Sequence, residues 1–548
     1  MSSAIRASLA CTTTVQTSSS MRAAHSLFNH NYQRITLCPR LCYSVVARRN
    51  LHVLVVPSLL LSPAPTQTSA STTTTIPRPS IFPTAPNLKK TMATVAHQAA
   101  SEKDTEIGTA TKIHLSPISD TGIFSTKIRP DSAEVTSALL QENHEEHHIF
   151  FNNLGFHNHI VHHLLTIYAI GASPETIKAA YVRGKSYQRP AMPANEGIVK
   201  ELYIKEHFMR YLGKEEVYAE FMTFFEKEIQ EKGVSKVVKD YLFAGDDRAE
   251  ALFRRLYSGL LHPFIHLGFA IEFNQPAILA EALAQTAVHE DYIAPLYLVP
   301  AEKAAGGVGK RGEKTLLHIL DEIHADKKLA SSAHWSDRNK FKDGVMTRAP
   351  DEMIKYASQF TISGDQLEEK NAELVNLAVY FSTASQHPPK EVKIDFFYLH
   401  CVTSSIFLSK FISLPFLDLH SKTRLLEWKG RMDLIMYVSR GAPDLSLQDV
   451  VRHPTSKDWN TIFSESAKHP KDDSHLSKME RAVAHGERVC RPFEGRAKEI
   501  GLMITGDMWL KIANMVLDSV TDDDNHPLWV RSTGFDEAWE EYPDRPQT

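Results

Sequence analysis

Gly155-Phe156-His157-Asn158-His159-Ile160-Val161-His162-His163-Leu164-Leu165 is the stretch that decides how the chain is interpreted, because it places four histidines within seven residues. From Gly155 to Gly171 nearly every residue is apolar or a histidine. The pattern predicts one mostly buried helix. On such a helix His159 and His163 stand one turn apart on the same face, where two neutral imidazoles can bind one metal ion.

Further histidines occur in other apolar segments. His262 and His266 stand four residues apart within residues 260–268. His289 ends a predicted helix, and His400 lies inside the apolar stretch 395–403. Each of them alone is readily explained as a core histidine bonded to a carbonyl group. Together with the first stretch they indicate a metal site assembled in a helical core.

The body of the chain predicts one helix after another. Apolar residues recur at three- and four-residue spacing with charged residues on the opposite face, and alternating strand patterns are scarce. We therefore expect an all-α fold, a single large helical domain over residues 133–548 with a buried histidine-rich metal site. The expected helices cover residues 198–212, 217–232, 249–261, 276–288, 367–382 and 395–411, and the expected loops cover 183–195, 304–314 and 441–475.

The first hundred residues have a different composition. No Asp or Glu precedes Glu102, while arginines are scattered among Ser, Thr and Pro. We expect a disordered leader over residues 1–100 and a linker over residues 101–132. The leader is either an organelle transit peptide or an over-extended gene model in which Met92 is the true start. The expected compartment is cytoplasmic, or mitochondrial if the leader is real.

Composition excludes several classes of partner. The net charge is -4, with 61 basic and 65 acidic residues, which gives no electrostatic reason to expect nucleic acid. The apolar run 51–61 is too short and too interrupted to cross a bilayer, so no membrane partner is expected. Of five cysteines only Cys401 and Cys490 lie in the body, which excludes a disulfide framework and a CxxC zinc site.

A glycine-rich loop at residues 306–312 formally contains GxGxxG. That fingerprint binds a dinucleotide only where a strand ends and a helix begins within a βαβ unit, and the sequence predicts no such unit. Arg311 also stands where a phosphate loop needs Ser or Thr for magnesium. We interpret the segment as a solvated basic loop, so that no fold for a flavin or a nicotinamide is predicted.

Two lysines lie in apolar helical settings. The segment 507–518 around Lys511 is apolar nearly all round, and Lys429 has leucines and methionines as its helical neighbours. A buried ammonium is costly, so each lysine is expected to be ion-paired, deprotonated or chemically modified. A structural ion pair or a side chain that reaches the surface explains both equally well.

Four long blocks of the body are similar in sequence to a known protein family. They are residues 142–175, 262–289, 395–405 and 427–437, the last reading EWKGRMDLIMY. From about Ala133 to the end, the chain resembles the questin oxidase-like family of fungal secondary metabolism. The resemblance implies an oxidoreductase that inserts oxygen into a polycyclic aromatic polyketide, such as an anthraquinone, and opens a ring. Two descriptions come with it: an NADPH-dependent Baeyer-Villiger enzyme, and a non-haem iron enzyme with histidine ligands and a carboxylated lysine.

The absence of a predicted nucleotide-binding fold favours ferrous iron and O2, with NADPH left open as a second cofactor. The metal ligands that the matching blocks imply are His159, His163, His266, His400 and Lys511. Lys429 is the rival of Lys511, and His262 and His289 are held in reserve. The alternatives are a helical metallohydrolase that uses Glu290 and Asp291, and a helical scaffold with structural histidines. No catalytic residue, NADPH-binding residue or oligomeric state is predicted.

Overall fold

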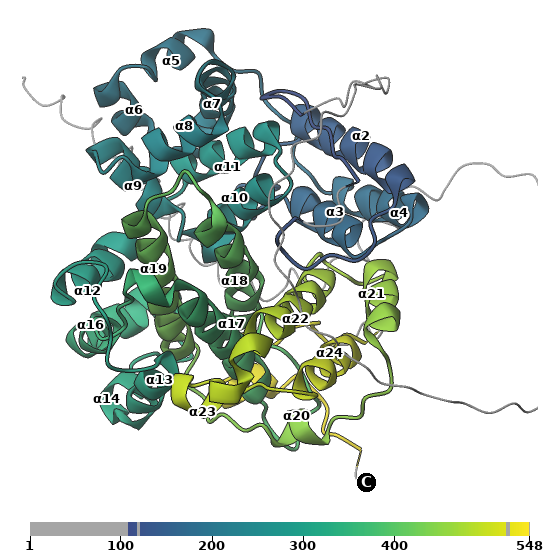
Figure 1. The fold of residues 1–548 in the computed structure, drawn as a ribbon, viewed down its shortest axis with the longest axis vertical. Coiled ribbons are helices and arrows are strands. Elements are labelled where there is room, and N and C mark those ends of the chain that lie inside the picture. The colour runs from purple at the N-terminus through teal and green to yellow at the C-terminus, as the bar shows by residue number, and fades with distance from the viewer. Residues whose placement is uncertain (1–107, 118–120, 522–525, 547–548) are drawn as a thin grey trace, which may run out of the picture. The chain divides into compact units, whose positions relative to one another are not determined.

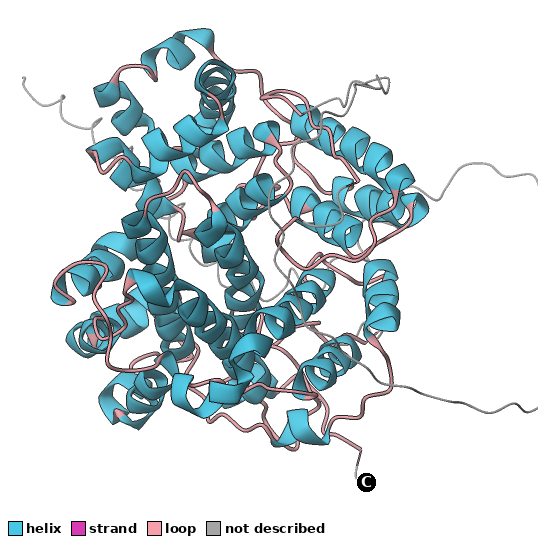
Figure 2. Ribbon diagram, in the orientation of Figure 1, coloured by secondary structure: helices cyan, strands magenta, loops and turns pink. Residues whose placement is uncertain are grey.

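The computed structural model describes residues 108–117, 121–521 and 526–546. Within these residues helices alternate with loops, and the β pairing consists of isolated bridges (Figure 2). The all-α fold class is therefore confirmed. The predicted leader, residues 1–100, lies outside the described residues.

The helices of the first half are α2 (Pro130–Glu146), α3 (Ile160–Ala169), α4 (Pro174–Lys185), α5 (Glu196–Glu201), α6 (Lys205–Tyr211), α7 (Tyr218–Lys232), α8 (Val234–Val238), α9 (Asp247–Arg255), α10 (His262–Glu272) and α11 (Pro276–Val288). Those of the second half are α12 (Val299–Ala304), α13 (Leu316–Ala325), α14 (Lys327–Ala330), α15 (Met346–Arg348), α16 (Pro350–Ala357), α17 (Leu367–Ala384), α18 (Tyr398–Ser413), α19 (Leu419–Ser439), α20 (Gln448–Arg452), α21 (Trp459–Lys468), α22 (Leu476–Cys490), α23 (Ala497–Ile500) and α24 (Met508–Ser519).

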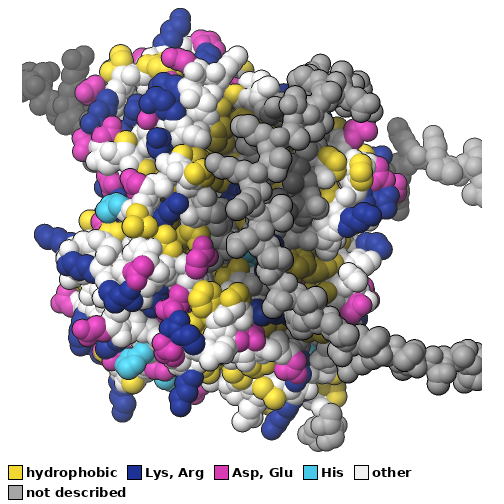
Figure 3. Space-filling view, in the orientation of Figure 1, with side chains coloured by type: hydrophobic (Ala, Val, Ile, Leu, Met, Phe, Trp, Pro, Cys, Tyr) yellow, Lys and Arg dark blue, Asp and Glu magenta, His cyan; other side chains and the backbone are white. Residues whose placement is uncertain are grey.

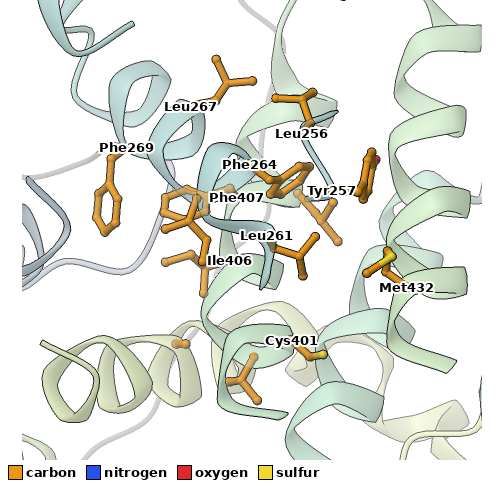
Figure 4. Packing of buried hydrophobic residues seen from close by; sticks show 14 of the residues in the cluster. Leu256, Tyr257, Leu261, Phe264, Leu267, Phe269, Cys401, Ile406, Phe407 and Met432 are labelled. Carbon is orange, nitrogen blue, oxygen red and sulfur yellow. The ribbon is translucent and has the colours of Figure 1, made fainter. Parts of the chain in front are cut away.

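The helices α3 and α10 are buried along their whole length, as their apolar sequences require. Figure 1 shows α10 and α18 in the middle of the arrangement of helices. α10 packs closely on α18, where Phe407 fills the space that Gly268 leaves open and Phe264 and Leu261 continue the contact (Figure 4). α3 packs on α10 and α22, and α22 packs in turn on α18. These four helices form the frame of the site described below.

Several predicted boundaries agree with the structure and others do not. The helix expected at 276–288 is α11, and the helix expected at 217–232 is α7. The predicted loop 441–475 is wrong in part, because it contains the helices α20 and α21. Both helices are short, and the polar residues around them hide their helical pattern in the sequence. The predicted linker is also corrected. Ile113, Leu115 and Ile123 are buried in the core, so the packed domain begins before residue 133.

Other expectations concern cysteines, charge and membranes. Cys401 and Cys490 are free and buried. No helix among the described residues is long and apolar enough to cross a membrane. On the face shown in Figure 3, basic and acidic side chains are intermingled over the described surface.

Candidate metal centre

The helix α3 starts one residue after His159, and the turn before it explains why. Gly155 has a φ of +74°, which ends the preceding loop in a left-handed conformation. The side-chain oxygen of Asn158 then accepts a hydrogen bond from the backbone N–H of Ile160 (2.9 Å). The predicted helical start at Gly155 is therefore wrong, and His159 stands at the cap position of α3.

A left-handed turn brings His262 to the same place. Gly259, Leu260 and Leu261 have φ values of +52°, +55° and +65°, a conformation that costs roughly 1–2 kcal/mol for each residue with a side chain. α10 begins directly after this turn, with His262 as its first residue. The Nδ1 atom of His262 lies 2.5 Å from the carbonyl oxygen of Gly259. Because a carbonyl only accepts, Nδ1 carries the proton.

Two further histidines complete the group. His400 lies in the first turn of α18, where its Nδ1 donates to the carbonyl oxygen of Phe396 (2.7 Å). His475 stands at the cap position of α22, and its Nδ1 lies 3.0 Å from a carboxylate oxygen of Asp473. Both Nε2 atoms are buried and have no hydrogen-bond partner among the described residues. They are therefore available to a ligand.

His159, His262, His400 and His475 form what we call the histidine cluster. One ring nitrogen of each of His159, His262 and His475 lies within 4.8 Å of the other two. The His400 ring centroid is 4.9 Å from that of His262 and 5.0 Å from that of His475. A metal–nitrogen distance of about 2.1 Å separates two opposite ligands by at most about 4.2 Å. The spacing therefore suits one metal ion after a small contraction.

The imidazoles of the histidine cluster are neutral at pH 7. Burial lowers the pKa values of His159, His262 and His400 well below the ordinary 6.5. In a neutral ring whose Nδ1 carries the proton, Nε2 keeps its lone pair. His262, His400 and His475 thus present the donor atom that a metal ion requires, with the other ring nitrogen held by an acceptor.

Four helix N-termini converge on the cluster. His159 and His475 cap α3 and α22, His262 opens α10, and His400 lies in the first turn of α18. The positive ends of the helix dipoles therefore point at one place, which disfavours an imidazolium and favours bound negative charge.

Lys478 lies in the first turn of α22, three residues after His475. Its Nζ is buried and has no hydrogen-bond partner among the described residues. Burial lowers the pKa of Lys478 to about 8, although Asp473 and Asp472 oppose this effect. Because residues three apart share one face of a helix, the side chain of Lys478 leaves α22 on the same face as that of His475. After burial, the charge of Lys478 is a further cause of the low pKa values of His159 and His400.

Comparison with known proteins identifies the relatives of the chain. The family model described as questin oxidase-like matches residues 156–483. A Baeyer-Villiger oxidase of Pestalotiopsis fici is 38% identical over 417 residues, covering 75% of this chain and 94% of the relative. A questin oxidase of Aspergillus terreus is 38% identical over 441 residues, covering 79% and 98%. A Baeyer-Villiger monooxygenase of Cryptosporiopsis sp. is 37% identical over 439 residues, covering 78% and 98%.

The chain belongs to the questin oxidase-like family. The resemblance seen in the sequence is thereby confirmed, and the matched region spans α3, α10, α18 and the first half of α22. Like its relatives, the chain is an oxidoreductase.

The ligands carried over from the questin oxidase-like resemblance divide into two sets. The structure brings His159 and His400 together and adds His262, which had been held in reserve. It does not bring His163 to them, because the Nε2 of His163 faces Asp472 at 3.3 Å. His163 thus lies outside the group formed by His159, His262 and His475, and it stays a prediction that His159 and His163 share one ion. His289 also stands outside the cluster, with its Nε2 lying 2.8 Å from that of His157.

His266 belongs to a separate group, which we call the Glu281 network. Its Nε2 lies 2.8 Å from one oxygen of Glu281, and the other oxygen of Glu281 lies 2.6 Å from Nδ1 of His144. The remaining nitrogen of His144 lies 3.2 Å from Glu226. Carboxylates therefore occupy both nitrogens of His144 and the Nε2 of His266, while Nδ1 of His266 lies 3.2 Å from Nε2 of His162. His266 thus lies in this network rather than in the cluster.

The two predicted lysines also lie elsewhere. Lys511 is part-exposed, and its Nζ lies 3.1 Å from Asp507 and donates to Val451 O (3.1 Å). The prediction that Lys511 is buried is wrong, because α24 turns that side of its surface outward. Lys429 is fully buried, but its Nζ is held by both oxygens of Asp433 at 2.6 Å and 2.5 Å. That contact is the structural ion pair considered as the alternative.

Sequence reasoning missed His475 and Lys478. His475 sits at the end of the polar run 441–475, which was interpreted as a loop. The missed signal is the pair Asp472-Asp473 just before α22, of which Asp472 accepts hydrogen bonds from the backbone N–H groups of Leu476 and Ser477 (3.0 and 3.3 Å). Acidic residues before an apolar periodic segment mark a helix start, and a histidine and a lysine three residues apart there share one face.

Proposed function

We propose that the chain inserts oxygen into a polycyclic aromatic polyketide and opens one of its rings, using non-haem iron held by the histidine cluster and O2. The observation that carries the proposal is the set of neutral imidazoles in which one ring nitrogen of each of His159, His262 and His475 lies within 4.8 Å of the other two. The names of the relatives, questin oxidase and Baeyer-Villiger oxidase, support the reaction class.

The residues of the cluster fit a ferrous ion. Imidazole nitrogen is a favoured ligand of iron, and the unpaired Nε2 atoms of His400 and His475 are costly to bury without a partner. His159, His262 and His475 would hold the ion, with His400 as the fourth nitrogen. When bound, iron would supply the redox chemistry that allows ground-state O2 to react with an organic substrate.

Lys478 takes the place that the resemblance gave to a carboxylated lysine. The neutral amine of a lysine attacks CO2, an N–C bond forms and a proton is released, which leaves an anionic carbamate oxygen. The low pKa of Lys478 makes the neutral amine accessible near pH 8. An anion at this position is favoured by the converging helix N-termini and would resolve the burial of Nζ without a partner.

The surroundings of the cluster suit a flat, acidic aromatic substrate. The ring of Phe396 lies 4.9 Å from that of His400 and 5.3 Å from that of His475. Aromatic walls bind a fused ring system by stacking, and the helix dipoles favour its phenolate form.

The test uses the full chain, purified without chelator and reconstituted anaerobically with Fe²⁺. Questin is added with ¹⁸O2, with and without NADPH, and the product is analysed by mass spectrometry. Ring-opened product that requires iron supports the proposal. Two labelled atoms without NADPH indicate a dioxygenase, and one labelled atom with NADPH indicates a Baeyer-Villiger monooxygenase. Product formed by iron-free protein with NADPH overturns the role of iron, and activity that depends on zinc or manganese with unlabelled product indicates hydrolysis.

A further inference from the structure

A short segment near the end of the described chain contacts two parts of the site at once. We call residues 529–533 the clip. The backbone N–H of Val530 donates to Ile394 O (3.1 Å), and the N–H of Phe396 donates to Val530 O (2.7 Å). The clip thus pairs with the chain that enters α18, and Val530 is fully buried. This pairing is an isolated bridge, so it is not part of any larger sheet among the described residues.

The clip meets α18 through one buried carboxylate. Asp395 is fully buried, and its Oδ1 accepts hydrogen bonds from the backbone N–H groups of Phe397 and Tyr398 (2.7 and 3.1 Å), which caps the first turn of α18. Its Oδ2 accepts hydrogen bonds from the N–H groups of Ser532 and Thr533 (2.7 and 2.8 Å). The same side chain therefore fixes the clip and the turn of helix that carries His400.

The clip meets α22 through an indole. The Nε1 atom of Trp529 donates to Oδ2 of Asp473 (3.1 Å), while Oδ1 of the same carboxylate holds Nδ1 of His475 (3.0 Å). Because the carboxylate accepts from both sides, its orientation is fixed by the indole, and the orientation of the imidazole follows from it. Trp529 itself is buried, so the indole has little freedom to move.

We propose that the clip is a positioning device that sets His400 through Asp395 and His475 through Asp473, so that both Nε2 atoms face the centre of the cluster. The inference rests on the proposed metal site. Outer hydrogen-bond partners fix the tautomer and the ring direction of a ligating histidine, and their loss commonly weakens metal binding by about 10–100-fold. Trp529, Asp473 and Asp395 are therefore positioning residues rather than ligands.

The experiment measures the affinity of the metal-free full chain for Co²⁺, and the visible absorption of the complex, in a double-mutant cycle. Trp529→Phe removes the indole N–H and keeps an aromatic ring. We expect it to weaken Co²⁺ binding about 10-fold and to shift the absorption bands. Asp473→Asn is expected to weaken binding by about 10–100-fold. The double variant should be no weaker than Asp473→Asn alone, because the indole acts through that carboxylate.

Two further variants separate positioning from folding. Trp509→Phe is the matched control, since Trp509 is buried and its indole N–H has no hydrogen-bond partner among the described residues. It should leave affinity and spectrum unchanged, whatever it does to the melting temperature. Asp473→Glu restores a carboxylate and should recover part of the affinity lost in Asp473→Asn.

The outcomes distinguish this inference from the proposed function. If the unsubstituted protein binds Co²⁺ and both Trp529→Phe and Asp473→Asn bind it equally well with the same spectrum, the clip has no positioning role. Additive losses in the double variant overturn the path through Asp473. If the unsubstituted protein itself binds neither Co²⁺ nor Fe²⁺, the metal site fails, and the inference fails with it.

Discussion

In the Glu281 network both ring nitrogens of His144 contact carboxylates, whereas in the histidine cluster His262 and His400 each bond one ring nitrogen to a backbone carbonyl. His144 lies between Glu281 at 2.6 Å and Glu226 at 3.2 Å, so both of its nitrogens are occupied. His400 gives one nitrogen to Phe396 O and keeps the other unpaired. The two groups share α10, on which His266 and His262 stand one turn apart.

The difference shows how one core makes structural histidines and ligand histidines from the same side chain. Burial would lower the pKa of His144, but Glu226 and Glu281 raise it to about 10, so His144 is a cation. A cationic imidazole has no lone pair to offer. A carbonyl partner adds no charge, and burial then keeps the ring neutral with Nε2 free. For His144 on one side and His262 and His400 on the other, the partner of the ring rather than its burial therefore decides whether one nitrogen keeps a lone pair.

The largest expected effect comes from replacing one histidine by glutamine in the histidine cluster and, for comparison, one histidine in the Glu281 network. His262→Gln should lower the affinity for Fe²⁺ by more than about 100-fold, because it removes a ligand rather than an outer partner. His266→Gln should keep the iron and lower the free energy of unfolding by about 2–3 kcal/mol, because Glu281 loses a buried partner. Iron content after reconstitution and urea unfolding measure the two quantities. Loss of iron in His266→Gln would break the comparison.

A second variant tests the turn that places His262. In Gly259→Ala the new Cβ would lie 2.6 Å from Cε1 of His289 and 3.0 Å from Cε1 of His157, at a φ of +52°. We expect a loss of about 2 kcal/mol in stability from the strained backbone and the displaced rings, and weaker Fe²⁺ binding. Gly495→Ala is the control, because its Cβ meets nothing within 4 Å. Unchanged stability and Fe²⁺ affinity in Gly259→Ala would show that the turn tolerates a side chain.

The Glu281 network should respond to pH in a defined direction. The pKa of His144 is about 10 in the folded chain and 6.5 ordinarily, so its ion pairs contribute fully below pH 6.5 and are lost as the pH rises toward 10. His144→Gln should therefore cost about 3 kcal/mol at pH 6 and less at each higher pH, with iron binding retained. Denaturant unfolding from pH 6 to 10 measures this. The control His318→Gln changes an exposed histidine, and a cost in His144→Gln that does not depend on pH would contradict the cationic assignment.

The smallest expected effect is that of Lys511→Ala. Its ammonium is part-exposed, so we expect a stability change of less than about 1 kcal/mol and full retention of iron. The matched variant Lys478→Ala should weaken iron binding, because it removes the lysine beside the cluster. Titration of both variants with Fe²⁺ in the presence of added bicarbonate measures the difference between their iron affinities. Equal iron affinity in the two variants would remove Lys478 from the site.

Much of the fold was predictable, because the spacing of apolar residues in segments such as 276–288 is compatible only with a buried helix. The site was predictable only in part. His159 and His400 stand in apolar stretches, which marks them as buried, but the sequence does not reveal which face another helix covers. His163 therefore looked equivalent to His159 until Asp472 was placed beside it. His475 and Lys478 follow a polar run, and their burial arises from tertiary packing of α22 on α3 and α18.

The clip also sets the order in which the site can be completed during synthesis. His159 precedes Thr533 by several hundred residues, which a ribosome adds in about 20–75 seconds at about 5–20 residues per second. All four histidines and Lys478 have been translated before Trp529 is added. The nascent chain thus holds every candidate ligand before it holds the segment that directs two of them, so a fully ordered cluster has to wait until residues 529–533 have been added.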